Sequence, residues 1–262
     1  MNNNLKSLAI ISSQAFSLVN FRGPLIQDLV AKGVRVYALA PDYSPKLRAR
    51  VASLGAEPVD YSLQRTGMNP LKDLRDLMGL VRVLRRLAPD ATFGYFIKPV
   101  IYGSLASLMA GVPRRFSMIE GMGYVYMDEF ARQGALRRVL RGAVSQLYKT
   151  ALACNERVFL LNRDDERYLV GRRLLEARKV TMINGIGLDL QHYQPQPLPK
   201  GPVTFTLISR MLHAKGIEDF VAAAREVRKT CPDVRFVLVG GTDGDERSVP
   251  RETLQSWVDE GL

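Results

Sequence analysis

Two basic residues at a predicted strand–helix junction, Arg210 and Lys215, are well placed to bind an anion. The run 203–208 is apolar and rich in β-formers and ends in Ser209-Arg210; after a short polar turn, helical spacing begins at Gly216. In α/β folds the carboxyl ends of strands line the ligand crevice, and helix N-termini there favour anions. Arginine supplies a forked donor and lysine a point charge, which together suit a diphosphate. A basic loop that faces water is the alternative interpretation.

The net charge is distributed unevenly over the 262 residues. Residues 203–262 contain 8 Lys+Arg and 10 Asp+Glu, a net charge of −2, so the total of +11 leaves +13 on residues 1–202. A basic first part predicts an anionic partner, which is a phosphate group, a membrane surface or nucleic acid. Nucleic acid is the least favoured, since no zinc-finger, helix-turn-helix or aromatic RNA-binding signature accompanies the charge.

The composition indicates a cytoplasmic globular protein. The first residues lack the apolar core of a signal peptide. The longest apolar region, 99–112, is shorter than the roughly 20 residues that span a bilayer. The two cysteines, Cys154 and Cys231, form no metal or redox motif and fit a reducing compartment. The sequence contains no evident metal-binding cluster, so no metal ion or cofactor is expected.

Alternating strand and helix patterns must position the two cations and any other site residues. The strand candidates before residue 193 are 8–12, 34–40, 56–61, 91–96, 115–119, 157–161 and 179–183. The helix candidates there are 24–32, 70–87, 102–110, 135–152 and a helix that begins at 164. This alternation of apolar strands and helices predicts an α/β fold, in which a parallel sheet has helices on both faces.

A proline-rich segment over residues 193–202 reads as a linker. After it the alternation restarts with a strand at 203–208, a helix at 216–229, a strand at 234–239 and a helix from about residue 252. We therefore expect one domain at 1–192 and a partial second domain at 203–262. Two strands are too little sheet for a domain that is stable alone.

Five segments of the chain carry a family resemblance: Asn20–Leu25, Ile97–Ser104, Met118–Val125, Asn184–Asp189, and Ser209-Arg210 with Lys215-Gly216. Together they resemble the family 4 glycosyltransferases, which are nucleotide-sugar enzymes. Within that family the chain looks like the bacterial branch that acts on lipid-linked oligosaccharides, capsule or O-antigen precursors. The resemblance implies a GT-B fold, two Rossmann-like domains that face a cleft, with the second domain incomplete here.

The function that this resemblance implies is transfer of a hexosyl or N-acetylhexosaminyl group, with retention of configuration, from a nucleotide sugar. UDP is the expected nucleotide, and a polyprenyl-linked or other saccharide is the expected acceptor, in surface polysaccharide biosynthesis. An inactive short form that only binds acceptor or membrane is the alternative. A dinucleotide-dependent oxidoreductase is disfavoured, because Ser12-Ser-Gln-Ala-Phe follows the first strand in place of a Gly-x-Gly-x-x-Gly motif.

By the same resemblance Arg210 and Lys215 bind the donor diphosphate, as their position already indicated. The turn at Gly23 opens the first helix and faces the same cleft, so its amides are expected near the phosphates or the transferred sugar. An ordinary helix start is the alternative at Gly23. Asn184 enters the crossing between the domains and is as readily structural as ligand-binding.

Glu120, Gly121 and Lys98 are the candidates for contact with the acceptor or the sugar. Glu120 ends a strand where many relatives have a histidine, so it either orients an acceptor hydroxyl or is a buried, hydrogen-bonded carboxylate. The glycine that follows permits close backbone approach. Lys98 also ends a strand and either meets an anionic acceptor or is a solvated lysine.

No dedicated catalytic nucleophile is identifiable, so catalysis is expected to rest on positioning and on stabilisation of the leaving diphosphate by Arg210 and Lys215. Relatives have a Glu-x7-Glu element late in the second domain. Two pairs here have that spacing, Glu218 with Glu226 and Glu252 with Glu260. Both pairs lie too early in the chain and lack the expected context, so we interpret them as coincidences on helix faces.

A basic amphipathic helix is predicted within residues 131–152, a segment without acidic residues. Its cations are Arg137, Arg138, Arg141 and Lys149. Such a helix either lies on an anionic membrane or packs its apolar side on the sheet with its charges in water. The first interpretation predicts peripheral association with the inner face of the plasma membrane.

Overall fold

The computed structural model describes residues 5–64, 69–123, 126, 134–242 and 248–261. The chain divides into two units, Met1–Tyr193 and Gln194–Leu262. This division assigns nearly all of the proline-rich segment 193–202 to the second unit. Each unit is described by itself.

The first unit contains a seven-stranded parallel sheet with the order β3-β2-β1-β4-β5-β6-β7. The predicted α/β fold with a parallel sheet is confirmed, and every strand end lies within one residue of its predicted position. The strands are β1 (Ser7–Ile11), β2 (Arg35–Ala40), β3 (Glu57–Asp60), β4 (Ala91–Tyr95), β5 (Arg114–Ile119), β6 (Arg157–Leu160) and β7 (Val180–Met182).

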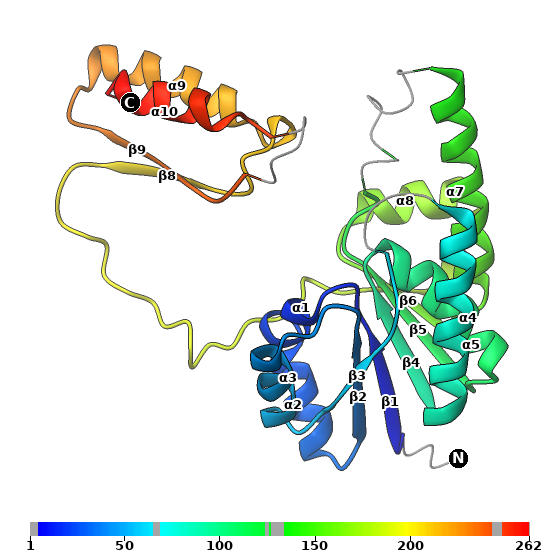
Figure 1. Ribbon diagram of the computed structural model, residues 1–262. Coiled ribbons are helices and arrows are strands. Elements are labelled where there is room, and N and C mark those ends of the chain that lie inside the picture. Colours follow the sequence, from blue (N-terminus) through cyan, green and yellow to red (C-terminus); the bar gives the residue numbers. More distant parts are fainter. Residues whose placement is uncertain (1–4, 65–68, 124–125, 127–133, 243–247, 262) are drawn as a thin grey trace. The chain divides into compact units, whose positions relative to one another are not determined.

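Helices cover both faces of this sheet (Figure 1). They are α1 (Ala15–Asn20), α2 (Gly23–Ala31), α3 (Pro45–Ser53), α4 (Pro70–Leu87), α5 (Ser104–Ala110), α7 (Ala135–Ala153) and α8 (Arg163–Gly171). A π-helical turn, η1 (Pro99–Gly103), precedes α5, and a 3-10 turn, η3 (Ala177–Lys179), precedes β7. Helices α1 and α3 were not predicted. Helix α3 does carry a local start signal, because the side chain of Ser44 caps it and Pro45 follows.

The core lies on both sides of the central strands because side chains alternate along each strand. Leu8 and Ile10 of β1 point to a cluster formed with α1, α2 and α3. Ala9 and Ile11 point to the opposite cluster, formed with α4 and α5. The strands therefore read as continuous apolar runs, which is the pattern of a parallel sheet that is buried on both faces.

The second unit has two parallel strands, β8 (Thr204–Ile208) and β9 (Arg235–Val239). The described part of this unit also contains a 3-10 turn, η4 (His213–Lys215), and the helices α9 (Ile217–Thr230) and α10 (Arg251–Asp259). Leu207 and Leu238 face the helices and join a small core around Ile217. Residues of the opposite strand face are exposed: Ile208 by 77%, Val237 by 38% and Val239 by 46%.

This contrast in burial predicts a contrast in local stability. Amide protons of β1 and β4, strands that are buried on both faces, should exchange with solvent more slowly than those of β8 and β9, because fewer apolar contacts resist local opening of the second unit. Hydrogen exchange followed by mass spectrometry measures this for each peptide. Equal protection of the two pairs of strands would contradict the prediction.

Candidate functional site

The candidate site lies at the carboxyl edge of the first sheet, where the strand order changes direction. From β1 the chain proceeds outward to β2 and β3 on one side, and it then returns to β4 and β5 on the other. In open α/β sheets, ligands bind at such switch points, beyond the carboxyl ends of the strands. Residues Ser12, Phe96 and Glu120 follow β1, β4 and β5 respectively at this edge.

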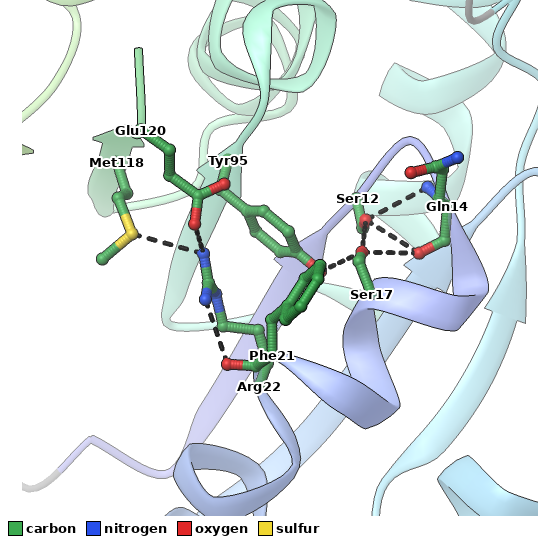
Figure 2. Close-up of polar contacts among 8 residues, drawn as sticks. All are labelled: Ser12, Gln14, Ser17, Phe21, Arg22, Tyr95, Met118 and Glu120. Atoms are coloured by element: carbon green, nitrogen blue, oxygen red, sulfur yellow. Dashed lines mark hydrogen bonds and ion pairs between the residues drawn. The ribbon is translucent and has the colours of Figure 1, made fainter. Parts of the chain in front are cut away.

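The guanidinium of Arg22 is the centre of this edge (Figure 2). Arg22 lies in the turn between α1 and α2 and is only 2% exposed. Its Nη2 forms an ion pair with Oε1 of Glu120 and lies 3.3 Å from the sulfur of Met118. Its Nη1 donates to the carbonyl of Phe21 at 3.0 Å. The turn between α1 and α2 is thereby tied to β5.

The ring of Tyr95 stacks against this guanidinium. The Cζ atom of Arg22 lies 4.2 Å from the centroid of the ring, a cation–π distance. The Tyr95 hydroxyl lies 2.7 Å from Oγ of Ser17, which in turn lies 2.8 Å from Oγ of Ser12. A continuous set of contacts therefore runs from Glu120 after β5, through β4, to the residues that follow β1.

The electrostatics of the cluster follow from its burial. The Glu120 side chain remains 20% exposed, whereas the Arg22 side chain is 2% exposed. Nε of Arg22 is buried and has no hydrogen-bond partner among the described residues. Removing one partner of a buried ion pair typically costs about 3–5 kcal/mol, because the other charge is left uncompensated. Burial also raises the pKa of the Tyr95 hydroxyl to about 12 from the ordinary 10.0.

The backbone beside the cluster has a positive φ at two positions. Phe96, directly after β4, has φ 68°, which is unusual for a bulky residue. Gly123 has φ 79°, and a Cβ atom there would lie 2.2 Å from Cδ1 of Ile97. Glycine is thus required at 123, whereas the predicted contact residue Gly121 has no such constraint and is exposed. The π-helical turn η1 begins two residues after Ile97, and such turns are frequent at functional sites.

Lys98 is held by an acidic residue of α4. Its Nζ donates to Oδ1 of Asp73 at 2.8 Å, and the two side chains are 14% and 8% exposed. The hydroxyl of Tyr102 donates to the other oxygen of Asp73 at 3.0 Å. Burial, followed by the hydrogen bond to Asp73, raises the pKa of Tyr102. Lys98 is therefore neither a solvated lysine nor a cation without a counter-charge, and its role at an acceptor stays a prediction.

The other predicted residues of the first unit lie apart from this cluster or contribute only backbone. Gly23 is the first residue of α2 and is buried, and a Cβ atom there would meet only Leu54 at 3.8 Å. Gly23 lies near the cluster only because it directly follows Arg22 in the sequence. Asn184 follows β7 and is exposed.

The second unit places Arg210 and Lys215 at the carboxyl end of β8, and both are exposed. Gly216, at φ 70°, forms the N-cap of α9. The first turn of α9 contains Glu218 and Asp219, of which Glu218 is paired with His213. The junction therefore combines two cations and a helix start with acidic side chains of the helix itself.

Sequence reasoning missed Arg22, Tyr95 and Ser17. Arg22 stands within the segment Asn20–Leu25 that supported the resemblance, but its partner Glu120 lies 98 residues further along the chain. The only signal that local sequence offered was a polar or aromatic residue at the end of a strand, as for Tyr95. That these side chains come together could be known only from the order of the strands in the sheet.

A hollow of about 530 Å³ lies at the opposite end of the first unit, where α7 and α8 end. Leu152 and Val170 contribute apolar lining, and Lys149, Arg173 and Lys179 contribute charge. Cations near helix C-termini complement the helix dipole, and Nζ of Lys179 donates to the carbonyl of Ala153 at 2.6 Å. We therefore interpret Lys179 as a helix-terminating group, and the candidate site remains the edge around Arg22.

Two further properties concern only the residues that the structure describes. Within them, no three His, Cys, Asp or Glu side chains are grouped so that they could hold a metal ion. None of the described helices has the length and apolarity needed to cross a membrane.

Comparisons with known proteins identify relatives for this arrangement. Residues 22–185 match the family described as "Glycosyl transferase 4-like domain". The chain is 27% identical over 266 residues to an N,N'-diacetylbacillosaminyl-diphospho-undecaprenol alpha-1,3-N-acetylgalactosaminyltransferase of Campylobacter jejuni, covering 95% of this chain and 67% of the relative. It is 24% identical over 188 residues to a UDP-Gal:alpha-D-GlcNAc-diphosphoundecaprenol alpha-1,3-galactosyltransferase of Escherichia coli, covering 67% of this chain and 46% of the relative.

Solved structures share the fold. A sucrose-phosphate synthase of Thermosynechococcus elongatus matches with a TM-score of 0.69 and 17% identity, covering 97% of this chain and 67% of that one. Anabaena HepE, solved in complex with UDP-glucose, matches with a TM-score of 0.65 and 15% identity, covering 98% and 66%. The chain thus spans about two thirds of the length of these structures and of the Campylobacter relative, and less than half of the Escherichia coli relative.

The buried hydroxyl of Tyr95 predicts a specific loss of stability at alkaline pH. Its pKa of about 12 exceeds the ordinary 10.0, so the unfolded chain releases this proton first, and the stabilisation present below pH 10 is lost as pH rises toward 12. Two pKa units correspond to about 2–3 kcal/mol. Tyr95→Phe should remove this part of the pH dependence, while costing about 1 kcal/mol at pH 8 for the lost contact with Ser17.

Urea unfolding of wild type and Tyr95→Phe at several pH values, followed by circular dichroism, measures both effects. Tyr193→Phe is the control, because Tyr193 is 58% exposed. A variant whose stability falls as steeply as that of the wild type above pH 10 would contradict the assignment.

Proposed function

This chain belongs to the glycosyl transferase 4-like family, because residues 22–185, more than half of the chain, match the model of that family. We propose that it transfers a sugar from a UDP-sugar to a polyprenyl-diphosphate-linked saccharide. The observation that carries the proposal is that the matched segment contains the whole Arg22, Tyr95 and Glu120 cluster at the switch point of the sheet. The proposed product is a hexosyl or N-acetylhexosaminyl linkage, formed with retention, in surface polysaccharide biosynthesis.

The acceptor side of the proposed site is the carboxyl edge of the first unit. Glu120 is partly exposed there and is fixed through one carboxylate oxygen, so it is suited to accept a hydrogen bond from a sugar hydroxyl. The names of both curated relatives specify undecaprenol-diphosphate-linked substrates, which supports an acceptor of this class for the present chain.

The donor side is proposed to be the junction of β8 and α9. Arg210 and Lys215 are exposed at the end of β8, where a diphosphate can reach them without displacing core residues. The Escherichia coli relative is named for UDP-Gal and Anabaena HepE was solved with UDP-glucose, which favours a uridine nucleotide.

Charge stabilisation of the leaving diphosphate is assigned to side chains in this proposal. Arg210 and Lys215 supply positive charge where the negative charge of the leaving group develops, and positioning of the two substrates supplies the remainder. No metal ion or other cofactor enters the proposed reaction.

Peripheral association with an anionic membrane, on the cytoplasmic face, is proposed through α7. The structure narrows the set of residues that could contribute. Residues 131–133 of the predicted segment lie outside the described residues, and Arg141 donates to the hydroxyl of Tyr168 at 2.8 Å. Arg138 and Lys149 are exposed, as is Val139 by 69%. A face with both cations and apolar side chains suits an interfacial helix.

Binding of the donor tests the proposed function directly. Arg210→Ala and Lys215→Ala should each weaken the binding of UDP by about 1.5–3 kcal/mol, roughly 10- to 150-fold, since each removes a charge-assisted contact. Calorimetry with UDP on wild type and variants measures this, with Arg228→Ala on the far part of α9 as the matched control. Unchanged affinity in both variants would overturn the donor site.

Sugar transfer from UDP-N-acetylgalactosamine or UDP-galactose to a GlcNAc-diphospho-lipid completes the test. The expected result is product formation that EDTA does not reduce. Acceptor binding without any transfer would favour the alternative, a module that only binds its acceptor or the membrane.

Association with vesicles tests the membrane proposal. Binding to vesicles with phosphatidylglycerol, but not to neutral vesicles, is expected, together with release by about 0.5 M salt because screening shortens the electrostatic range to a few ångströms. Arg138→Gln with Lys149→Gln should weaken binding by roughly 2 kcal/mol, about 30-fold, at about 1 kcal/mol per cation. Arg82→Gln with Arg86→Gln on α4 removes the same charge elsewhere and is the control. Equal binding to neutral vesicles would refute the electrostatic contribution.

A further inference from the structure

We propose that Arg22 is a positioning residue that acts through Glu120, holding this carboxylate so that its second oxygen can orient the acceptor hydroxyl. The inference rests on the proposed function, because the acceptor is the saccharide named there. It assigns a role to a residue that the sequence analysis did not single out. It also explains why a charged side chain is buried at the switch point of the sheet.

The guanidinium has almost no freedom to move. Tyr95 covers its face at 4.2 Å, the carbonyl of Phe21 binds Nη1 at 3.0 Å, and Glu120 and the sulfur of Met118 contact Nη2. These contacts come from the turn between α1 and α2, from β4 and from β5. Since the three elements belong to one packed sheet and its covering helices, the position of Nη2 is set by the core of the first unit.

The ring of Tyr95 is fixed in the same way. Its hydroxyl lies 2.7 Å from Oγ of Ser17, and Oγ of Ser17 also donates to the carbonyl of Gln14 at 2.7 Å. The face on which the guanidinium rests therefore cannot tilt without breaking contacts at the end of β1. Figure 2 shows these contacts extending from Glu120 to Gln14.

Glu120 differs from Arg22 in that it reaches the surface. Its side chain is 20% exposed, and its only described hydrogen bond is the one that Oε1 accepts from Arg22. A carboxylate held by one oxygen keeps a defined plane, and its other oxygen retains capacity to accept. A hydroxyl bound there would be held in one orientation, and orientation of a reacting group is a principal source of rate enhancement.

A second pair in the same unit shows what such a contact looks like when it has only a surface role. Arg35 lies 4.9 Å above the ring of Tyr37 and pairs with Glu57 at 2.9 Å, so its chemistry matches that of Arg22. Its side chains are 66% and 47% exposed, at the amino edge of the sheet. The Arg22 pair differs in being buried and in lying at the carboxyl edge, where the ligand crevice is expected.

Kinetics of transfer to a GlcNAc-diphospho-lipid from UDP-N-acetylgalactosamine or UDP-galactose tests the inference. Arg22→Met and Glu120→Gln should each raise the KM for the acceptor and lower kcat/KM by roughly tenfold or more, the range for a lost charge-assisted contact. The kcat/KM of the double variant should be no lower than that of the poorer single variant, because both changes remove the same Arg22–Glu120 interaction. Arg22→Lys, which keeps the charge, should recover part of the loss. Affinity for UDP should not change.

Arg35→Met is the matched control and should behave as wild type. If Arg22→Met lowers the thermal midpoint while the kinetics per folded molecule stay at the wild-type values, Arg22 is structural and the inference is overturned. Effects of the two single variants that multiply in the double variant would also overturn it, since Arg22 would then act independently of Glu120.

A spectroscopic arm separates this inference from the proposed function. In NMR spectra, a guanidinium that cannot rotate gives resolved Nη proton signals. The wild type should therefore show these signals for Arg22. The Glu120→Gln variant should lose them, and the methyl signal of Met118 should shift. Averaged Nη proton signals in the wild type would show that Arg22 is not held in place and would overturn the inference. The wild type could instead show resolved signals but neither transfer sugar nor bind the acceptor. This result would confirm that Arg22 holds Glu120, and it would overturn the proposed function and the role of the acceptor in this inference.

Discussion

The burial of one positive charge constrains the arrangement of the carboxyl edge in the first unit. The guanidinium of Arg22 is out of water, and it is compensated by the carboxylate of Glu120 directly after β5, an aromatic face from β4 and a carbonyl from its own turn. An uncompensated charge in the interior is unfavourable by several kcal/mol, so displacement of any of these groups is opposed strongly. The ends of two strands and the start of α2 are therefore fixed relative to one another more tightly than apolar packing alone requires.

The parallel sheet provides the framework in which this interaction can form. Because β1, β4 and β5 run in the same direction side by side, the residues that follow them meet at one edge. The backbone is strained at Phe96, which has a positive φ, and Gly123 adopts a positive φ that a larger residue would reach only with strain. Strain of this kind persists only where the surrounding core is well packed, and the core clusters on both faces of β1 supply that packing.

The charge of the protein is used in two ways. Arg22 and Lys98 are largely withdrawn from solvent, Arg141 is half-buried, and all three have internal partners, so their positive charge serves the structure of the first unit. Arg138 and Lys149 of α7 are exposed, as are Arg210 and Lys215 in the second unit. Because Glu120 and Asp73 cancel the charges of Arg22 and Lys98, the formal net charge of +11 resides on the remaining residues. The proposals for the membrane and for the donor depend on these exposed cations.

The sequence by itself determined the fold class and the strands of the parallel sheet, because burial on both faces leaves continuous apolar runs that need no knowledge of neighbours. It also placed Glu120 at a strand end, but it placed Lys98 there wrongly, because Lys98 lies three residues after β4 in the helical turn that leads into η1. It did not determine α1, which has six residues and whose first amide is capped by the carboxylate of Asp42 from after β2. Nor did it show that Lys98 binds Asp73 or that Arg22 binds Glu120. Those pairings join residues far apart in the chain, and only the order of the strands, which local patterns do not encode, brings them within hydrogen-bonding distance.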